Sequence, residues 1–383
     1  MTLPLSEDNK MHIPWKALIP AVIAGVLAAG GCGSNEKTTA PRAAPTSSGS
    51  ADAGEKRIII ITNGDSPFWT AARVGLQEAE KELNLAKSGL RASLEINNSK
   101  PQGQIDLLRQ YATQSDIVGI GISPVVADNV AVAEEMRNLR KKGVLVITVD
   151  SDVDRARFRD ARYAFIGTDN LSGGRELGKC ALGLRPEGGQ YVTFVGHTGA
   201  QNALDRVEGV RQGAGPKFKA LDNMGDETDP TRARDNVHNA ILNHPGLTTL
   251  VGIWSYNAPA IVDVVKQKQV RKNYNVVVFD AEPLAIQQMG EGYIDAMVVQ
   301  NPYQMGYQGV RLLKALYEKD QATVRAILPN EGQGEGDIYD TGIKVVVPDS
   351  GSLLRGEMFD KKTQFLKLSD FREWLKKYNL TGS

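Results

Sequence analysis

Short apolar blocks alternate with longer amphipathic segments along most of the chain. The first block, 57–63, contains four consecutive isoleucines, and the segment 71–83 that follows it has apolar residues at helical spacing. Continuous apolar runs are typical of strands buried on both faces, and a 3.6-residue period indicates helices. The pattern predicts strands at 92–98, 117–123, 144–150, 164–170, 190–197, 248–255, 275–280 and 294–300, and helices at 101–114, 126–143, 171–184, 202–213, 231–245, 258–270, 283–292 and 303–319.

Strands that alternate with helices in this way indicate parallel sheets covered on both faces. About ten such units are too many for one compact sheet, so we expect an α/β fold of two doubly wound parallel-sheet domains joined by hinge strands. The expected N-terminal lobe is 57–168 with 301–342. The expected C-terminal lobe is 169–300 with 343–383, and it includes an amphipathic tail helix that docks on it.

The N-terminal segment is typical of export. Lys10 and Lys16 precede the apolar run 17–32, which is too short and too rich in small residues for a stable membrane span. Its end resembles the bacterial lipobox, which implies a signal peptide at 1–31 and a lipidated Cys32. A plain export signal with an incidental cysteine is the alternative. Residues 32–56 are rich in Ser, Thr, Ala, Pro and Gly, which predicts a flexible tether.

Composition excludes several classes of function. The 383 residues include 45 Lys and Arg and 45 Asp and Glu, so the formal net charge is zero, which argues against a nucleic-acid partner. Only Cys32 and Cys180 are cysteines, so no disulfide framework is expected, and Cys180 is interpreted as a small buried residue. The histidines show no metal-ligand spacing, and we expect neither metal nor cofactor.

Polar and aromatic residues collect where the predicted strands end. In open parallel sheets, ligands bind beyond the carboxyl ends of the strands. Aromatic faces suit the C–H faces of a sugar ring, and carboxylates, amides and Arg can bond its hydroxyls. The residues at these ends are Asp65 to Trp69, Ser123-Pro124, Asp150, Asn202 and Arg206, Tyr256-Asn257, Asp280 and Gln300.

Five motifs carry a resemblance to a known family: SPFW at 66–69, VITVDS at 146–151, NALDRVEGV at 202–210, VVVFD at 276–280 and VVQNPYQMG at 298–306. In this order they resemble the type I periplasmic sugar-binding proteins, and most closely the ribose-binding subgroup. That family shares its fold with the effector domain of lactose-repressor-type regulators. The resemblance covers roughly 57–347.

The resemblance implies a role for each matching residue. Phe68 and Trp69 match the aromatic pair that sandwiches the sugar, and Arg206 matches an arginine of the site. The residues expected to bond hydroxyls are Ser66, Ser123, Asp150, Asn257, Asp280 and Gln300, with Tyr256 as the alternative to Asn257. Ser151 stands where the ribose subgroup has a second arginine, and Ser66 and Ser123 replace longer amides, so ribose is not assigned.

Structural roles are the alternatives for these residues. Phe68 and Trp69 are candidates for core aromatics at a helix start, although two adjacent large rings cannot both face one apolar layer. Asp150 and Asp280 are candidates for helix N-caps, Arg206 for a surface ion pair, and Gln300 for a loop hydrogen bond.

The sequence therefore predicts a monomeric, non-enzymatic solute-binding lipoprotein of an ABC-type importer. We expect it in the periplasm, anchored to a membrane through Cys32, with a monosaccharide ligand and a membrane permease as partners. One alternative is a sensory sugar- or autoinducer-binding subunit for a chemoreceptor or kinase. Another is an exported glycoside hydrolase that uses Asp65, Asp150 or Asp280.

Overall fold

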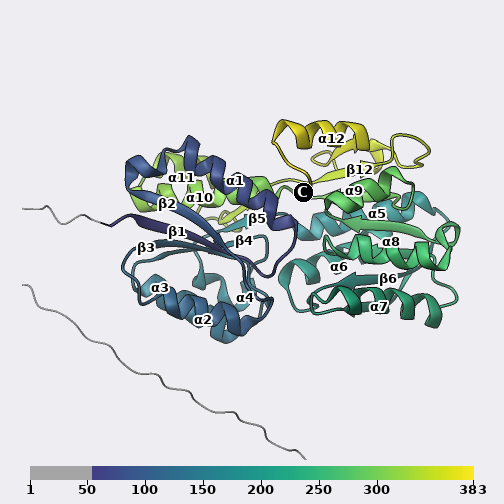
Figure 1. The fold of residues 1–383 in the computed structure, drawn as a ribbon, viewed down its shortest axis with the longest axis horizontal. Helices are drawn as coiled ribbons and strands as arrows, with labels where there is room; N and C mark the ends of the chain where they lie inside the picture. Colours follow the sequence, from purple (N-terminus) through teal and green to yellow (C-terminus); the bar gives the residue numbers. More distant parts are fainter. Residues whose placement is uncertain (1–53) are drawn as a thin grey trace, which may run out of the picture. The chain divides into compact units, whose positions relative to one another are not determined.

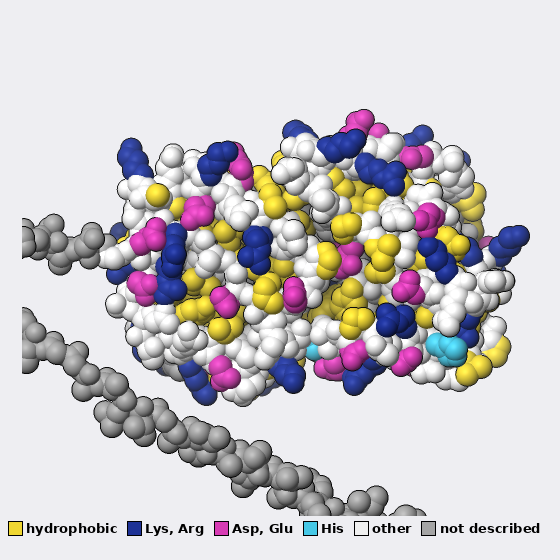
Figure 2. Space-filling view, in the orientation of Figure 1, with side chains coloured by type: hydrophobic (Ala, Val, Ile, Leu, Met, Phe, Trp, Pro, Cys, Tyr) yellow, Lys and Arg dark blue, Asp and Glu magenta, His cyan; other side chains and the backbone are white. Residues whose placement is uncertain are grey.

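The structure, a computed structural model, describes residues 54–383. The predicted signal peptide, the lipobox cysteine and nearly all of the tether therefore lie outside the described residues. Within the described part, no helix combines the length and the apolar character that a bilayer crossing needs. Basic and acidic side chains are interspersed on the face shown in Figure 2.

Two sheets organise the described chain into two α/β domains, here called lobe 1 and lobe 2 (Figure 1). The lobe 1 sheet has the order β11-β5-β4-β3-β1-β2, and all of its pairs are parallel. Its strands are β1 (Lys56–Ile61), β2 (Leu90–Glu95), β3 (Ile117–Ile122), β4 (Leu145–Val149), β5 (Phe165–Gly167) and β11 (Ile338–Asp340).

Helices cover both faces of the lobe 1 sheet. Ile58 and Ile60 pack in one apolar cluster with the helices on one face, whereas Ile59 and Ile61 pack in another cluster with the helices on the opposite face. This division explains the unbroken apolar run, because successive side chains of a strand point to opposite faces. The helices are α1 (Phe68–Glu82), α10 (Pro302–Glu318) and α11 (Gln321–Ile327) on the first face, and α2 (Pro101–Tyr111) and α3 (Val130–Lys141) on the second, with the short α4 (Arg155–Phe158) after β4.

The lobe 2 sheet has the order β13-β12-β10-β9-β8-β6-β7, in which β12 is antiparallel to β10 and every other pair is parallel. Its strands are β6 (Gly189–Val195), β7 (Phe218–Gly225), β8 (Thr249–Gly252), β9 (Asn275–Phe279), β10 (Ala296–Val299), β12 (Lys344–Val347) and β13 (Gln364–Lys367). Its helices are α5 (Asn170–Leu184), α6 (Gln201–Ala214), α7 (Pro230–Asn243), α8 (Asn257–Lys268), α9 (Pro283–Gly290) and α12 (Leu368–Lys377).

The predicted fold class is confirmed. The sequence pattern missed the edge strands β7, β11 and β13 and the neighbouring β12. Strand β7 lies at the edge of its sheet and buries only Phe218 fully, so it lacks the apolar run that marks the central strands. The tail helix α12 buries Phe371 and Leu375 in the core of lobe 2.

The chain passes between the sheets three times: from β5 to α5, from β10 to α10 and from β11 to β12. Hydrogen bonds tie these three connections together. Thr168 Oγ1 donates to Gln300 Oε1 at 2.9 Å, and Thr341 Oγ1 donates to the Gly167 carbonyl at 3.0 Å. The connections therefore act as one bonded unit at the base of the two lobes.

Helices α1 and α10 pack closely enough for their backbones to touch. A Cβ on Gly306 would lie 2.0 Å from the Ala72 carbonyl oxygen, and one on Gly75 would lie 1.9 Å from the Tyr303 carbonyl oxygen. Only glycine allows this approach. The contact fixes α1, whose first two residues are Phe68 and Trp69.

We expect Gly306→Ala to lower the free energy of unfolding by about 1–3 kcal/mol, because the new methyl group must push α1 away from α10. Gly309→Ala, in the same helix, is the matched control. Its Cβ would meet its nearest atom at an ordinary 3.5 Å, so helix propensity should leave stability unchanged or raise it by up to about 1 kcal/mol. Urea denaturation measures both variants, and equal effects would contradict this account of the helix pair.

Candidate functional site

A cavity lies between the two lobes, at the carboxyl ends of the strands of both sheets. Its empty volume is about 430 Å³, which includes space open to solvent. Lobe 1 and lobe 2 both supply its walls. The lining residues are Asn63, Gly64, Asp65, Ser66, Phe68, Trp69, Asp150, Asn202, Arg206, Thr228, Trp254, Ser255, Tyr256, Asp280 and Gln300.

Most of the residues singled out from the sequence lie together at this cavity. Ser66, Phe68, Trp69, Asp150, Arg206, Asp280 and Gln300 line it. Ser123 and Asn257 do not. The structure thus brings together side chains that are more than 200 residues apart in the chain. Ser123 and Asn257 instead form hydrogen bonds that support the neighbouring structure.

Ser123 is fully buried behind the cavity wall. Its hydroxyl donates to Asp150 Oδ2 at 3.0 Å, and its carbonyl accepts from the Gln104 amide at 2.6 Å. Ser123 is thus not among the lining residues, and its expected bond to a ligand hydroxyl stays a prediction. A short hydroxyl at this strand end reaches only the neighbouring strand, and there it supports the Asp150 carboxylate.

Asn257 is replaced at the cavity by Tyr256. The Asn257 side chain accepts from the Trp254 backbone N–H at 3.0 Å and donates to Asp226 Oδ2 at 2.9 Å. It closes the turn between β8 and α8, as Asn commonly does beside a helix start. Tyr256 lines the cavity instead, and its hydroxyl bonds Asp226.

Phe68 and Trp69 lie at the first turn of α1. Their ring centroids are 5.2 Å apart and their planes are perpendicular, an arrangement that favours edge-to-face attraction. Trp69 Nε1 donates to Asn63 Oδ1 at 3.2 Å. Both rings are almost fully buried, yet both border the cavity, so they combine core packing with exposure to the space between the lobes.

The two cavity carboxylates occupy equivalent positions in the two lobes. Asp150 follows β4 and Asp280 follows β9, and both have left-handed backbones, with φ of 66° and 67°. Neither is an N-cap, because Asp154 caps α4 and Glu282 precedes α9. Such backbone conformations cost about 1–3 kcal/mol and cluster at functional sites.

Burial raises the pKa of both carboxyl groups, and Arg206 opposes the rise. The pKa of Asp280 rises to about 7. Gln300 Nε2 donates to Asp280 Oδ1 at 2.8 Å, which is the main hydrogen bond that this carboxylate receives from a side chain. Gln300 is itself fixed by Thr168 at the base of the lobes.

Arg206 is a buried cation rather than a surface ion-pair partner. Its Nε donates to Asn170 and its Nη1 to the Ile253 carbonyl, at 2.8 and 3.0 Å, while Nη1 lies 3.9 Å from Asp280 Oδ2. The guanidinium stacks 3.9 Å from the centroid of the Phe279 ring. Its Nη2 is buried and has no hydrogen-bond partner among the described residues, although the residue itself lines the cavity.

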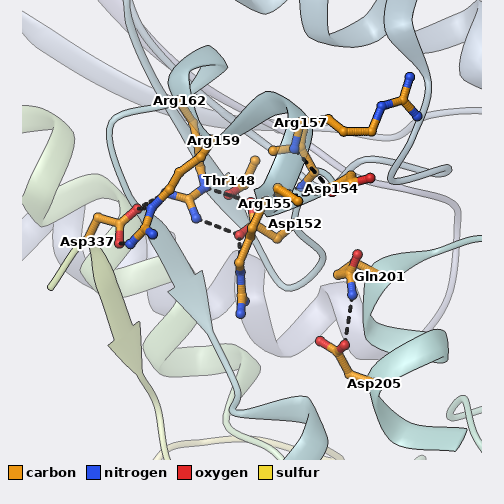
Figure 3. Close-up of polar contacts among 12 residues, drawn as sticks. Thr148, Asp152, Asp154, Arg155, Arg157, Arg159, Arg162, Gln201, Asp205 and Asp337 are labelled. Carbon is orange, nitrogen blue, oxygen red and sulfur yellow. Dashed lines mark hydrogen bonds and ion pairs between the residues drawn. The ribbon is translucent and has the colours of Figure 1, made fainter. Parts of the chain in front are cut away.

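An ion network holds the loop that carries Asp150 (Figure 3). Asp152 is buried and accepts from Thr148 Oγ1 at 2.6 Å and from two nitrogens of Arg162 at 2.7 and 2.6 Å. Arg162 also bonds Asp337, just before β11. Arg162 thus forms hydrogen bonds with the carboxylates of both Asp152 and Asp337. This network restricts the movement of the loop that carries Asp150.

Sequence reasoning missed Asn63, Thr228, Trp254 and Ser255. Asn63 lies in the loop directly after β1, two residues beyond the strand end, and Trp254 lies two residues beyond β8. Both fall inside the segments that the pattern assigned to strands, 57–63 and 248–255, because each strand ends earlier than expected. Thr228 has a left-handed backbone in the loop after β7, the strand that the pattern did not reveal.

The cavity offers flat aromatic rings together with planar carboxylate, amide and guanidinium groups that can accept or donate hydrogen bonds. Indole and phenyl faces meet C–H groups, carboxylates accept from hydroxyls, and Arg206 and Gln300 donate. A ligand with many hydroxyl groups matches this set, because each buried hydroxyl needs a partner.

Comparison with known proteins gives the family context. Residues 58–321 match the sequence model of the periplasmic binding protein domain. The ribose import binding protein of Salmonella typhimurium is 24% identical over 270 residues, covering 70% of this chain and 86% of that protein. The D-allose-binding periplasmic protein of Escherichia coli is 22% identical over 274 residues, covering 69% and 85%.

Solved structures share the fold. A solute-binding protein of an ABC transporter from Burkholderia graminis, in complex with D-arabinose, has a TM-score of 0.67 and 23% identity, covering 79% of this chain and all of that one. One from Agrobacterium vitis with bound D-fucose also has a TM-score of 0.67, with 20% identity and coverage of 76% and 95%.

The buried carboxylates predict a pH dependence of stability. A raised pKa means that the folded state holds its proton more tightly than the unfolded state, so the free energy of unfolding should fall as pH rises from about 4 to 7. For Asp280 this amounts to about 2–4 kcal/mol. Asp280→Asn should remove that share and leave the shares of the other buried carboxyls whose pKa burial raises, among them Asp150, Glu282 and Asp226, the last to about 6.

Urea denaturation without added sugar at pH 5 and pH 8 measures the difference. Asp263→Asn, which removes an exposed carboxylate on α8, is the control and should keep the full pH dependence. A wild-type protein that is more stable at pH 8 than at pH 5 would show that burial does not govern Asp280.

Proposed function

This chain belongs to the periplasmic binding protein family, and from that premise we propose that it binds a monosaccharide in the cavity between its lobes. The single observation that supports this most is the opposition of Phe68 and Trp69 on one lobe to Arg206, Asp280 and Gln300 at the other wall. The relatives are named for ribose and allose import or binding, and two of the solved structures contain D-arabinose and D-fucose.

We infer that binding draws the lobes together. The rings of Phe68 and Trp69 stack on the sugar, and the polar groups of lobe 2 then bond its hydroxyls and exclude water. A ligand stabilises the closed arrangement only through contacts that the open arrangement lacks. Contacts from both lobes to one small ligand meet that requirement. No covalent step is involved.

A hydrolytic role is poorly supported by the same geometry. Glycoside cleavage needs a carboxylic acid that stays protonated to serve as the general acid. Burial raises the pKa of Asp280 to about 7, which would suit such an acid, although Arg206 at 3.9 Å favours the ionised form. The second carboxylate that cleavage also needs is not free, because Asp150 Oδ2 already accepts three side-chain hydrogen bonds from the protein. We therefore propose a binding protein that delivers its sugar to the permease of an ABC-type importer.

We also propose that the protein is held at the membrane by lipid on Cys32. The apolar run before Cys32 and the tether-like composition after it support this, since an acyl chain and a flexible linker hold a domain at a bilayer surface without crossing it.

The purified full-length chain should bind at least one monosaccharide with a dissociation constant on the order of a micromolar. A saturating sugar, at about a hundredfold excess over that constant, should raise the free energy of unfolding by about 2.7 kcal/mol. Thermal-shift screening of pentoses, hexoses and polyols, followed by calorimetry, identifies it. Absence of any binding, or turnover of chromogenic glycosides, would refute the proposal.

Trp69→Leu should weaken that binding by at least about tenfold, because leucine fills much of the volume but offers no flat ring. Tyr317→Ala, which removes an exposed aromatic residue of α10 outside the cavity, is the matched control and should bind as the wild type does. Calorimetry on both variants measures this. Undiminished binding by Trp69→Leu would rule out the stacking role.

Cys32→Ser should move the protein from the membrane fraction to the soluble fraction and abolish incorporation of labelled palmitate, because the acylated thiol is lost. Cys180→Ala, which leaves Cys32 in place, should remain with the membrane. Palmitate labelling of Cys32→Ser at the wild-type level would contradict the proposed anchor.

A further inference from the structure

One oxygen of Asp150 is the meeting point of three side-chain donors. Asp150 Oδ2 accepts from Ser123 Oγ at 3.0 Å, from Asn63 Nδ2 at 3.4 Å and from Asn202 Nδ2 at 3.3 Å. Ser123 and Asn63 belong to lobe 1, as Asp150 does, but Asn202 is on α6 of lobe 2. The carboxylate therefore bonds across the gap between the lobes.

Each of the two asparagines also holds a tryptophan. Asn63 Oδ1 accepts from Trp69 Nε1 at 3.2 Å, and Asn202 Oδ1 accepts from Trp254 Nε1 at 3.3 Å. The two arms are equivalent: in each lobe an indole N–H bonds an amide oxygen, and the amide nitrogen bonds Asp150 Oδ2. Both indoles line the cavity.

Three consequences follow from this arrangement. The indole N–H groups are already engaged, so a ligand meets the faces and edges of the rings rather than their donors. Asp150 Oδ2 is occupied by protein donors, which leaves Oδ1 as the acceptor for a ligand hydroxyl. The orientation of Trp254 depends on Asn202, and Asn202 reaches Asp150 only when the lobes are together.

We propose that Asn63, Asp150 and Asn202 form a relay that sets the orientation of the Trp69 and Trp254 rings together, so that lobe closure and the alignment of both stacking surfaces are one event. Asn63 and Asn202 are positioning residues in this relay. The inference rests on the proposed sugar-binding function and extends it. It states that the side-chain amides of Asn63 and Asn202 determine the spacing and angle of the two indole rings that line the cavity.

Two further contacts support the coupling. The Ala127 N–H donates to the Gly199 carbonyl at 3.1 Å, so the loops before α3 and before α6 also meet across the lobes, close to Asn202 in sequence. The His197 ring packs edge-on against Trp254, with centroids 5.6 Å apart. Trp254 is therefore held from its back by His197 and at its N–H by Asn202.

Direct contact between Asn202 and the ligand is the competing explanation, because Asn202 lines the cavity. The two explanations differ in the sugar-free protein. In the relay, removing the Asn202 amide disturbs Trp69, which lies in the other lobe and whose indole N–H bonds Asn63 rather than Asn202. In the direct-contact explanation, Trp69 is unaffected until a sugar is added.

The experiment is ¹⁹F NMR on the full-length chain labelled with 5-fluorotryptophan, with the four tryptophan resonances assigned by single Trp→Phe variants. Asn202→Leu, of similar size but without the amide, should shift or broaden the resonances of both Trp254 and Trp69 without sugar. Gln212→Leu, an exposed change on the same helix, should move neither. Ser123→Ala removes a donor from the same Asp150 oxygen without touching either arm, and should move Trp254 less than Asn202→Leu does.

Binding of the sugar identified by screening gives the second readout. Asn202→Leu should weaken it at least tenfold in the wild-type background and clearly less in Trp254→Phe, which keeps a ring but lacks the N–H. An unmoved Trp69 resonance in Asn202→Leu, or equal losses in the two backgrounds, would overturn the relay.

Trp254→Phe alone provides the test if Asn202→Leu does not fold. It should move the Trp69 resonance, and a Trp69 resonance that stays in place would overturn the relay as well. A wild-type protein that binds no monosaccharide refutes the proposed function, whereas the sugar-free spectra still decide whether the two indoles are coupled.

Discussion

The cavity depends on one constraint, which is that buried carboxylates at the ends of two facing sheets must find partners. Asp150 and Asp280 stand at equivalent strand ends and are almost fully buried, and the positive charge of Arg206 acts on both. An unpaired buried charge is costly, so the surrounding side chains are arranged to supply hydrogen bonds. Asp150 receives three, and Asp280 receives one from Gln300. Asp280 therefore has fewer hydrogen bonds from the protein than Asp150 and more capacity to accept one from a ligand.

The framework around the carboxylates restricts how they can respond. Helix α1 is pressed against α10 at glycine contacts, the loop of Asp150 is held by the Asp152–Arg162 pair, and Gln300 is bonded to Thr168 at the base of the lobes. Relaxation away from the cavity would break these contacts. Arg206, whose Nη2 has no hydrogen-bond partner among the described residues, and Asp280 therefore stay at the cavity that both of them line.

The sequence predicted the parts of this arrangement that have a one-dimensional signature. Central strands such as β1 and β9 contain unbroken apolar runs because helices cover both of their faces, and that pattern is visible without a structure. The residue immediately after such a strand could therefore be selected from the sequence, and Asp150 and Asp280, selected in this way, line the cavity. The edge strand β7 carries no such pattern, and Thr228 after it was missed.

The direction in which a side chain points after a strand could not be predicted from the sequence. Ser123 stands at the end of β3, as expected for a cavity residue, but its short hydroxyl ends on Asp150. Asn257 and Tyr256 are neighbours, and which of them faces the cavity is decided by the first turn of α8 and by Asp226, which lies 31 and 30 residues earlier in the chain. Such choices depend on contacts between distant segments.

The same dependence explains why the tryptophans matter as a pair. A single stacking ring could be placed by local packing alone, as Trp69 is by the first turn of α1. Two rings on separate lobes need a common reference, because a small rotation of either lobe changes the slot between them. Asp150 Oδ2 is a reference that both lobes reach, through amides of equal length and through bonds between 3.2 and 3.4 Å along each arm. Bonds of this length are individually weak, so the arms align the rings without locking the lobes, and a bound ligand can still be released.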